Sequence, residues 1–75
     1  MDAAERLALD LPIDLNRATR DELMLVPGIG ETTADRIVQV RNSSGLFRKV
    51  ADLKNVPGIK ERKLKRWEQS FYLPP

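Results

Sequence analysis

The sequence predicts an all-α domain, a compact bundle of two helical hairpins related by a pseudo-twofold axis. Pro-Gly-Ile occurs at 27–29 and again at 57–59, and each copy follows a Leu-x-x-Val segment. When residues 21–41 are laid over 51–71, a Glu and an Arg also match. A chain of 75 residues buries only about 60% of its unfolded surface, so two hairpins packed together would share one thin core.

The repeat divides the chain into an N-terminal segment and a packed domain. Residues 1–12 are expected to form a flexible or short-helical segment, and residues 13–73 the domain itself. Within the domain, the first motif covers about 19–42 and the second about 50–71. The two apolar faces would pack together, which would place both glycine turns side by side on one surface.

The N-terminal segment has the signals of one short helix. Asp2 and Glu5 have the spacing of a capping box, which predicts a helix over 3–9. Pro12 then prevents its continuation. A helix this short is marginal in water, so it should fray unless its leucines dock on the core.

The first hairpin is predicted to begin at a second capping box. Residues 14–16 are expected to be extended, and Thr19 with Glu22 then caps a helix over 20–25. Pro27 ends this helix because the residue before a proline is disfavoured in the helical region.

The second helix of the first hairpin is expected over 31–42. Gly28 and Gly30 precede it and are expected to take positive φ angles in the turn. Gly45 is expected to be a left-handed C-terminal residue. The buried stripe of this helix should contain residues at helical spacing: Ala34, Ile37, Val38 and Arg41.

The second hairpin repeats the arrangement. Residues 46–47 are expected to fill the core between the halves, followed by a helix over 50–55 and the turn at 57–60. A last helix over 61–71 would leave 72–75 as a tail. Its buried stripe is formed by Leu64, Trp67 and Phe71. Trp67 is therefore interpreted as a core residue, and base stacking is not expected.

Composition excludes several function classes. With no His and no Cys, the usual zinc sites and disulfide frameworks are excluded, and no cofactor or metal is expected. No nucleophile–base pair can be identified, so the chain is not expected to be an enzyme. No signal peptide or membrane segment is visible, which predicts a soluble chain. The compartment stays open: cytoplasmic, or an exported domain of an anchored protein.

Charge is distributed unevenly along the chain. Residues 1–47 carry five Lys/Arg and eight Asp/Glu, a net charge of −3. Residues 48–75 carry eight Lys/Arg and three Asp/Glu, a net charge of +5. The basic half suits a polyanion, and the acidic half could contact a protein partner.

The glycine turns are candidate phosphate sites. Amides at the start of a helix lack an intrahelical acceptor, and the helix dipole adds positive charge there. Glycine lets a phosphate oxygen approach the backbone closely. In the first turn the candidate groups are the N–H groups of Ile29, Gly30 and Thr32, with the hydroxyls of Thr32 and Thr33. In the second they are the N–H groups of Ile59 and Lys60, with the Lys60, Arg62 and Lys63 side chains.

Over residues 13–71 the pattern closely resembles the tandem helix-hairpin-helix domain of ComEA-type competence DNA receptors. It consists, in order, of Asp14-Leu15-Asn16, Ala18-Thr19, Glu22-Leu23, Val26-Pro27-Gly28-Ile29-Gly30, Ala34, Ile37, Phe47, Asp52-Leu53 and Val56-Pro57-Gly58-Ile59. The resemblance implies a small helical SAM-like or helix-hairpin-helix-like fold from a bacterial family. It also implies sequence-independent binding of double-stranded DNA in competence, with hairpin backbones on phosphates either side of the minor groove. The implied contacts are Gly28, Ile29, Gly30, Gly58 and Ile59.

Three features depart from that family. Lys60 replaces the second glycine and would either adopt a strained positive φ or change the shape of its turn. Lys49 occupies the position of the usual Ser or Thr N-cap. The N-terminal membrane anchor typical of those receptors is also expected to be absent. The alternative function is a protein-interaction module that has lost DNA binding.

Overall fold

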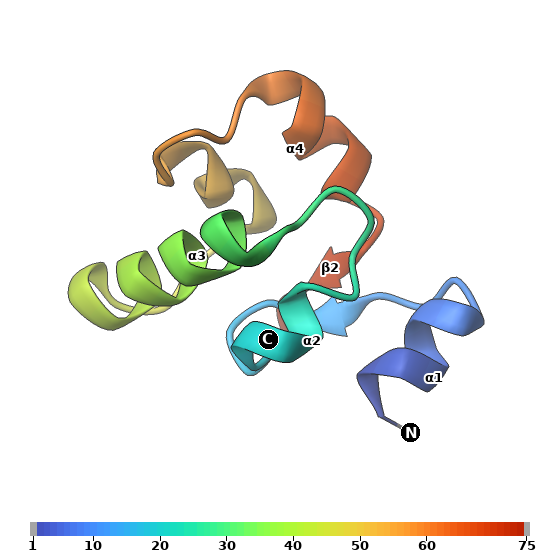
Figure 1. Cartoon of the computed structure of the whole chain (residues 1–75). Helices are drawn as coiled ribbons and strands as arrows, with labels where there is room; N and C mark the ends of the chain where they lie inside the picture. Colours follow the sequence, from blue (N-terminus) through green and yellow to red (C-terminus); the bar gives the residue numbers. More distant parts are fainter. Residues whose placement is uncertain (1, 75) are drawn as a thin grey trace.

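Two helical hairpins form the body of the molecule. The computed structural model describes residues 2–74. The molecule measures 29 × 25 × 20 Å, and the two hairpins pack around a single core (Figure 1). The first segment contains α2 (Arg20–Leu23) and α3 (Glu31–Ser44), and the second contains the 3₁₀ helix η1 (Val50–Asn55) and α4 (Glu61–Trp67). The all-α class predicted from the sequence is confirmed.

The capping box of α2 forms as predicted. The Glu22 amide donates to Thr19 Oγ1 at 3.1 Å, and the Thr19 amide donates to Glu22 Oε1 at 2.8 Å. The helix is shorter than expected because its end tightens before Pro27. The amides of Leu25 and Val26 donate to carbonyls three residues back instead of continuing the α-helical pattern.

Helix α3 is longer than expected and runs to Ser44. Ala34 and Ile37 are buried, as predicted. Arg41 is only partly buried, and its guanidinium donates to the carbonyls of Leu15 and Ala18 at 2.9 and 2.8 Å. Gly45 ends the helix with a positive φ of 92°, as expected, but its ψ of 176° is extended and not that of a left-handed helical residue.

In the second hairpin, Lys49 makes no side-chain cap for η1, and Asp52 instead reaches back to the amides that precede the helix. Its carboxylate accepts from the amides of Arg48 and Lys49 at 3.2 and 3.3 Å. Helix α4 ends at Trp67 and not at 71. The Ser70 amide donates to the Trp67 carbonyl, which closes a turn and releases the following residues from the helix.

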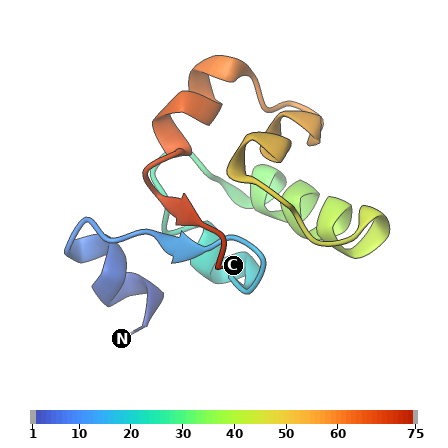
Figure 2. The ribbon, with the colours of Figure 1, turned by 180° about the vertical axis from the view of Figure 1, so that it is seen from behind.

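The segment expected to be a tail begins with a strand. β2 (Phe71–Tyr72) pairs in parallel with β1 (Ile13–Asp14), with Ile13 opposite Phe71 (Figure 2). Phe71 is buried, as its apolar spacing predicted, but it lies in a strand and not in the predicted helix. This two-residue pairing joins the two ends of the domain.

Helix α1 (Ala3–Ala8) packs beside this pairing. The Asp2 carboxylate caps it by accepting from the Glu5 amide at 2.8 Å. Ala3 is buried and Leu7 packs against the core, whereas Leu9 is 61% exposed. Of the leucines expected to dock, Leu7 therefore holds the segment against the core and Leu9 does not.

Among residues 2–74, sixteen buried apolar residues form the core, drawn from α1, both hairpins, the two strands and the connecting segments. Phe47 is among them, but Leu46 is 66% exposed, so only one of these two neighbours fills the core. The Asn16 side chain fixes Phe47 by donating to its carbonyl at 2.9 Å and accepting from its amide at 2.8 Å. Within residues 2–74, no helix has the length and apolar character required to cross a bilayer.

Candidate nucleic-acid interface

Both glycine turns present backbone to solvent. We define the first turn as residues 26–30 and the second turn as residues 56–60. The glycines Gly28, Gly30 and Gly58 are exposed, whereas the Ile29 and Ile59 side chains are buried. Each isoleucine therefore anchors its turn in the core and leaves the surrounding backbone accessible.

The isoleucine amides are not available to a ligand. The Ile29 amide donates to the Val26 carbonyl at 3.0 Å, and the Ile59 amide donates to the Val56 carbonyl at 3.1 Å. The expectation that these two N–H groups are unpaired is wrong, because each closes its own turn.

Other amides in the turns have no acceptor within the described part of the chain. In the first turn and the start of α3 they belong to Gly28, Gly30, Glu31, Thr32 and Thr33. In the second turn and the start of α4 they belong to Gly58, Lys60, Glu61 and Arg62. Unpaired amides at a helix start attract anions.

The two turns have the same backbone form. Gly28 and Gly58 have φ angles of 93° and 89°, which only glycine adopts easily. Gly30 and Lys60 have φ angles of −96° and −102° and are extended N-cap residues. The positive φ expected at Gly30 is therefore wrong. Neither alternative considered for Lys60 is observed, because it has no positive φ and its turn keeps the form of the first.

Each turn is held by the second helix of the other hairpin. Trp67 Nε1 donates to the Pro27 carbonyl at 2.9 Å, and Arg36 Nη1 donates to the Pro57 carbonyl at 3.2 Å. The first turn accordingly lies against the end of α4 in Figure 1. Trp67 is 1% exposed, which confirms its core assignment. No local pattern indicates the role of Arg36, because its contact joins residues of different hairpins.

The Lys/Arg side chains of the two halves of the chain differ in their bonding partners. All five Lys/Arg residues of 1–47 are engaged, by carboxylates or by backbone carbonyls. Across residues 48–74, none of the eight Lys/Arg side chains makes a hydrogen bond or ion pair with another described residue. The cationic side chains of the basic half are therefore not held by other described residues.

Arg20 shows how charge in the first half is neutralised. Its guanidinium hydrogen-bonds Asp35 and lies within 4.0 Å of Glu31 and 3.7 Å of Asp21. The hydrogen bond to Asp35, followed by its charge, raises the pKa of Arg20 above the ordinary value. This cation stays charged and is committed to joining α2 and α3.

Two surface depressions have contrasting linings. Gly58, Lys60, Glu61, Arg62 and Lys63 border an open depression of about 590 Å³ at the head of α4. Its cations are the Lys60, Arg62 and Lys63 side chains expected from the sequence, all exposed. This basic depression suits an anion.

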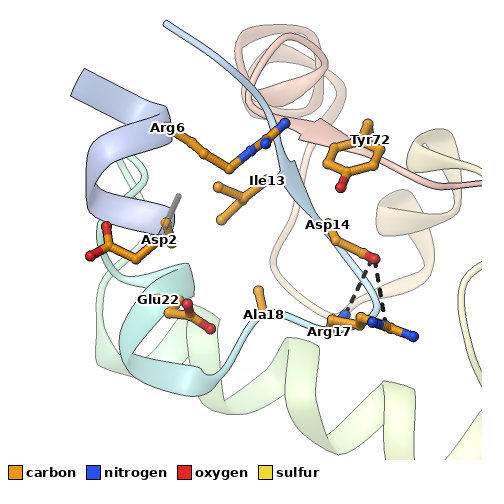
Figure 3. Close-up of a pocket in the computed structure, with 9 residues that line it drawn as sticks. Asp2, Arg6, Ile13, Asp14, Arg17, Ala18, Glu22 and Tyr72 are labelled. Atoms are coloured by element: carbon orange, nitrogen blue, oxygen red, sulfur yellow. Dashed lines mark hydrogen bonds and ion pairs between the residues drawn. The ribbon is translucent and has the colours of Figure 1, made fainter. Parts of the chain in front are cut away.

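The other depression, of about 280 Å³, lies between α1, β1 and α2 (Figure 3). Its charged lining is mixed: Asp2, Arg6, Asp14, Arg17 and Glu22. Its two cations are already engaged, Arg6 with the Pro12 carbonyl and Arg17 with Asp14 at 4.0 Å. This depression does not suit a polyanion. Among residues 2–74, no cluster of three or more metal-binding side chains occurs.

A family model of the helix-hairpin-helix motif matches residues 11–72. The chain belongs to the helix-hairpin-helix family. The match spans both turns and the strand pairing between β1 and β2.

Relatives of this helix-hairpin-helix chain include much longer proteins. Endonuclease/exonuclease/phosphatase family domain-containing protein 1 is 42% identical in Danio rerio over 52 residues, which is 69% of this chain and 10% of that protein. The Homo sapiens protein of the same name is 41% identical over 54 residues, 72% of this chain and 10% of that protein. ComE operon protein 1 of Bacillus subtilis is 31% identical over 59 residues, 79% of this chain and 29% of that protein.

The chain spans about a tenth of the length of the vertebrate relatives it matches. The enzymatic name of those relatives describes a protein of which this segment is a small part.

Proposed function

We propose that this domain binds double-stranded DNA without sequence preference, through phosphate contacts made by both turns. The observation that carries the proposal is the set of unpaired amides in exposed turns beside unneutralised cations. Family membership supports it, as does the likeness to ComE operon protein 1. We also propose a bacterial role related to competence, on the pattern shared with ComEA-type receptors.

The first turn would hold phosphate mainly with its backbone. The Gly30 and Thr32 amides would donate at the start of α3, a helix of 14 residues whose dipole favours an anion. The Thr32 and Thr33 hydroxyls can donate nearby. Ile29 would contribute by anchoring the turn and not by its paired amide.

The second turn would hold phosphate mainly with side chains. Lys60, Arg62 and Lys63 are exposed around Gly58 and make no ion pair with another described residue. Ile59 would again anchor the turn, since its side chain is buried and its amide paired. Lysine and arginine attract phosphate by charge and tolerate variation in its position.

The separation of the turns allows both to contact one duplex. Arg36 lies about 7.5 Å along α3 from Glu31, at 1.5 Å per residue. From that position its guanidinium reaches Pro57. The two turns would therefore be near enough to contact neighbouring phosphates of one duplex.

Fluorescence anisotropy with a labelled duplex tests the proposal. Two unrelated sequences of equal length should bind equally, because phosphate contacts carry no sequence information. With about four phosphates contacted, log K should fall against log salt with a slope of about −3.6. Absence of binding at low salt, or strong dependence on sequence, would refute it.

Charge reversal separates DNA binding from protein docking. Arg62→Glu together with Lys63→Glu should weaken duplex binding at least tenfold. Arg62→Glu alone should act far more strongly than Arg17→Glu, which changes the net charge equally at a side chain already beside Asp14. Docking through the acidic half would survive the reversals at Arg62 and Lys63.

A further inference from the structure

Arg36 places a cation of the first hairpin on the turn of the second. Its Nη1 donates to the Pro57 carbonyl at 3.2 Å. A Cβ atom at Gly58 would lie only 2.6 Å from the same nitrogen. The guanidinium therefore lies directly over the glycine, in the space that any other residue at 58 would fill.

The charge of Arg36 is not neutralised by its neighbours. The adjacent Asp35 is committed to Arg20, and no carboxylate of residues 2–74 forms an ion pair with Arg36. Arg36 is exposed. A guanidinium has five N–H donors, of which the Pro57 carbonyl occupies one.

We propose that Arg36 is a DNA-contact residue of the second turn, which it also positions. The inference rests on the proposed DNA binding and adds a residue that the sequence pattern does not indicate. A planar guanidinium can donate two parallel hydrogen bonds to a phosphate. Because the Pro57 carbonyl already orients it, Arg36 loses less freedom on binding than Lys60, Arg62 or Lys63 would.

The first turn has a neutral counterpart. There Trp67 lies over Gly28, with its Nε1 3.3 Å from where a Cβ atom would be. The indole holds the Pro27 carbonyl but adds no charge. Each turn is thus held by a side chain from the other hairpin, and only in the second turn is that side chain a cation.

Salt-dependent duplex binding by Arg36→Gln is the test, with Arg17→Gln as the matched control. Both variants change the net charge by one unit and leave a polar side chain. Loss of one phosphate contact should make the slope of log K against log salt shallower by about 0.9 in Arg36→Gln and leave it unchanged in Arg17→Gln. Arg36→Lys should retain most of the slope. Equal slopes for Arg36→Gln and the wild type would overturn the proposal.

A measurement on the unmodified chain covers the case in which Arg36→Gln does not fold. The Arg36 side-chain N–H resonances should shift when duplex is added at low salt. Unchanged Arg36 signals in a complex that shifts the backbone amides of the turns would refute the Arg36 contact and leave the proposed function standing. Absence of any complex would refute both.

Discussion

At position 28 the backbone requires glycine, whereas at position 30 it does not. Gly28 has a φ of 93°, and a Cβ there would press on Trp67. Gly30 is extended, and a Cβ there would meet nothing within 4 Å. The first glycine of Pro-Gly-Ile-Gly therefore serves folding, and the second leaves backbone accessible to a ligand.

Alanine at these two positions should separate the roles. Gly28→Ala should lower the free energy of unfolding by about 1–3 kcal/mol, because a side chain is strained at positive φ. Gly30→Ala should cost less, about 0.5–1 kcal/mol as an N-cap change, and should also weaken duplex binding. Thermal melts and anisotropy on both variants provide the measurements. Equal destabilisation by the two changes would contradict this assignment.

Asn16 is a polar cross-link that the composition of the chain does not reveal. Its amide makes both a donor and an acceptor bond with the backbone of Phe47. Asn16→Ala should cost about 1–3 kcal/mol, because both backbone groups of Phe47 lose their partners. Asn42→Ala, at an exposed position of α3, is the control and should leave the melting temperature nearly unchanged. Chemical denaturation of the two variants gives the comparison.

At the scale of elements, local signals predicted most of the fold. The Thr19–Glu22 box and the prolines at 27 and 57 placed the helices of both hairpins, because caps and breakers act over a few residues. The strand pairing of β1 with β2 was missed, since two-residue strands show no period. Phe71 also continued the helical spacing of Trp67, so periodicity favoured the wrong element.

The same limit explains what was missed in the candidate site. The exposed glycines and basic side chains could be read from the sequence. The paired amides of Ile29 and Ile59 follow from how each turn closes, and the Arg36 contact joins residues of different hairpins. Contacts of this kind depend on tertiary placement and leave no local pattern.

The capping box of α2 provides a prediction at the same scale. Thr19→Ala removes the oxygen that accepts from the Glu22 amide and should cost about 1 kcal/mol. Thr19→Ser retains a hydroxyl and should cost much less. In a domain of this size, 1 kcal/mol corresponds to a shift of about 4–8 °C in melting temperature. Similar melting temperatures for the two variants would show that the cap is unimportant.

The stability of the whole domain depends on the contact between its first and last segments. The amides of Ile13 and Leu15 donate to the carbonyls of Ser70 and Tyr72 at 2.9 and 3.1 Å. Phe71 contributes a buried ring to a core of only sixteen apolar residues. The β1–β2 pairing therefore joins the first and last segments of the packed domain.

Truncation should reveal this dependence. Removal of residues 71–75 deletes a buried aromatic side chain, worth about 3–5 kcal/mol, as well as β2. Such a loss is a large part of the stability of a small domain, so circular dichroism should show an unfolded or nearly unfolded chain. Removal of residues 74–75 alone should leave the melt nearly unchanged. A cooperative melt of the chain that lacks residues 71–75 would contradict the role given to β2.

Binding of one duplex by both turns can be tested by backbone amide mapping by NMR during titration with a short duplex at low salt. We expect the largest shifts at residues 28–33 and 58–63, in both turns together, and we expect added salt to reverse them. Shifts confined to residues 2–22, or to one turn alone, would contradict binding of duplex DNA through two phosphate sites.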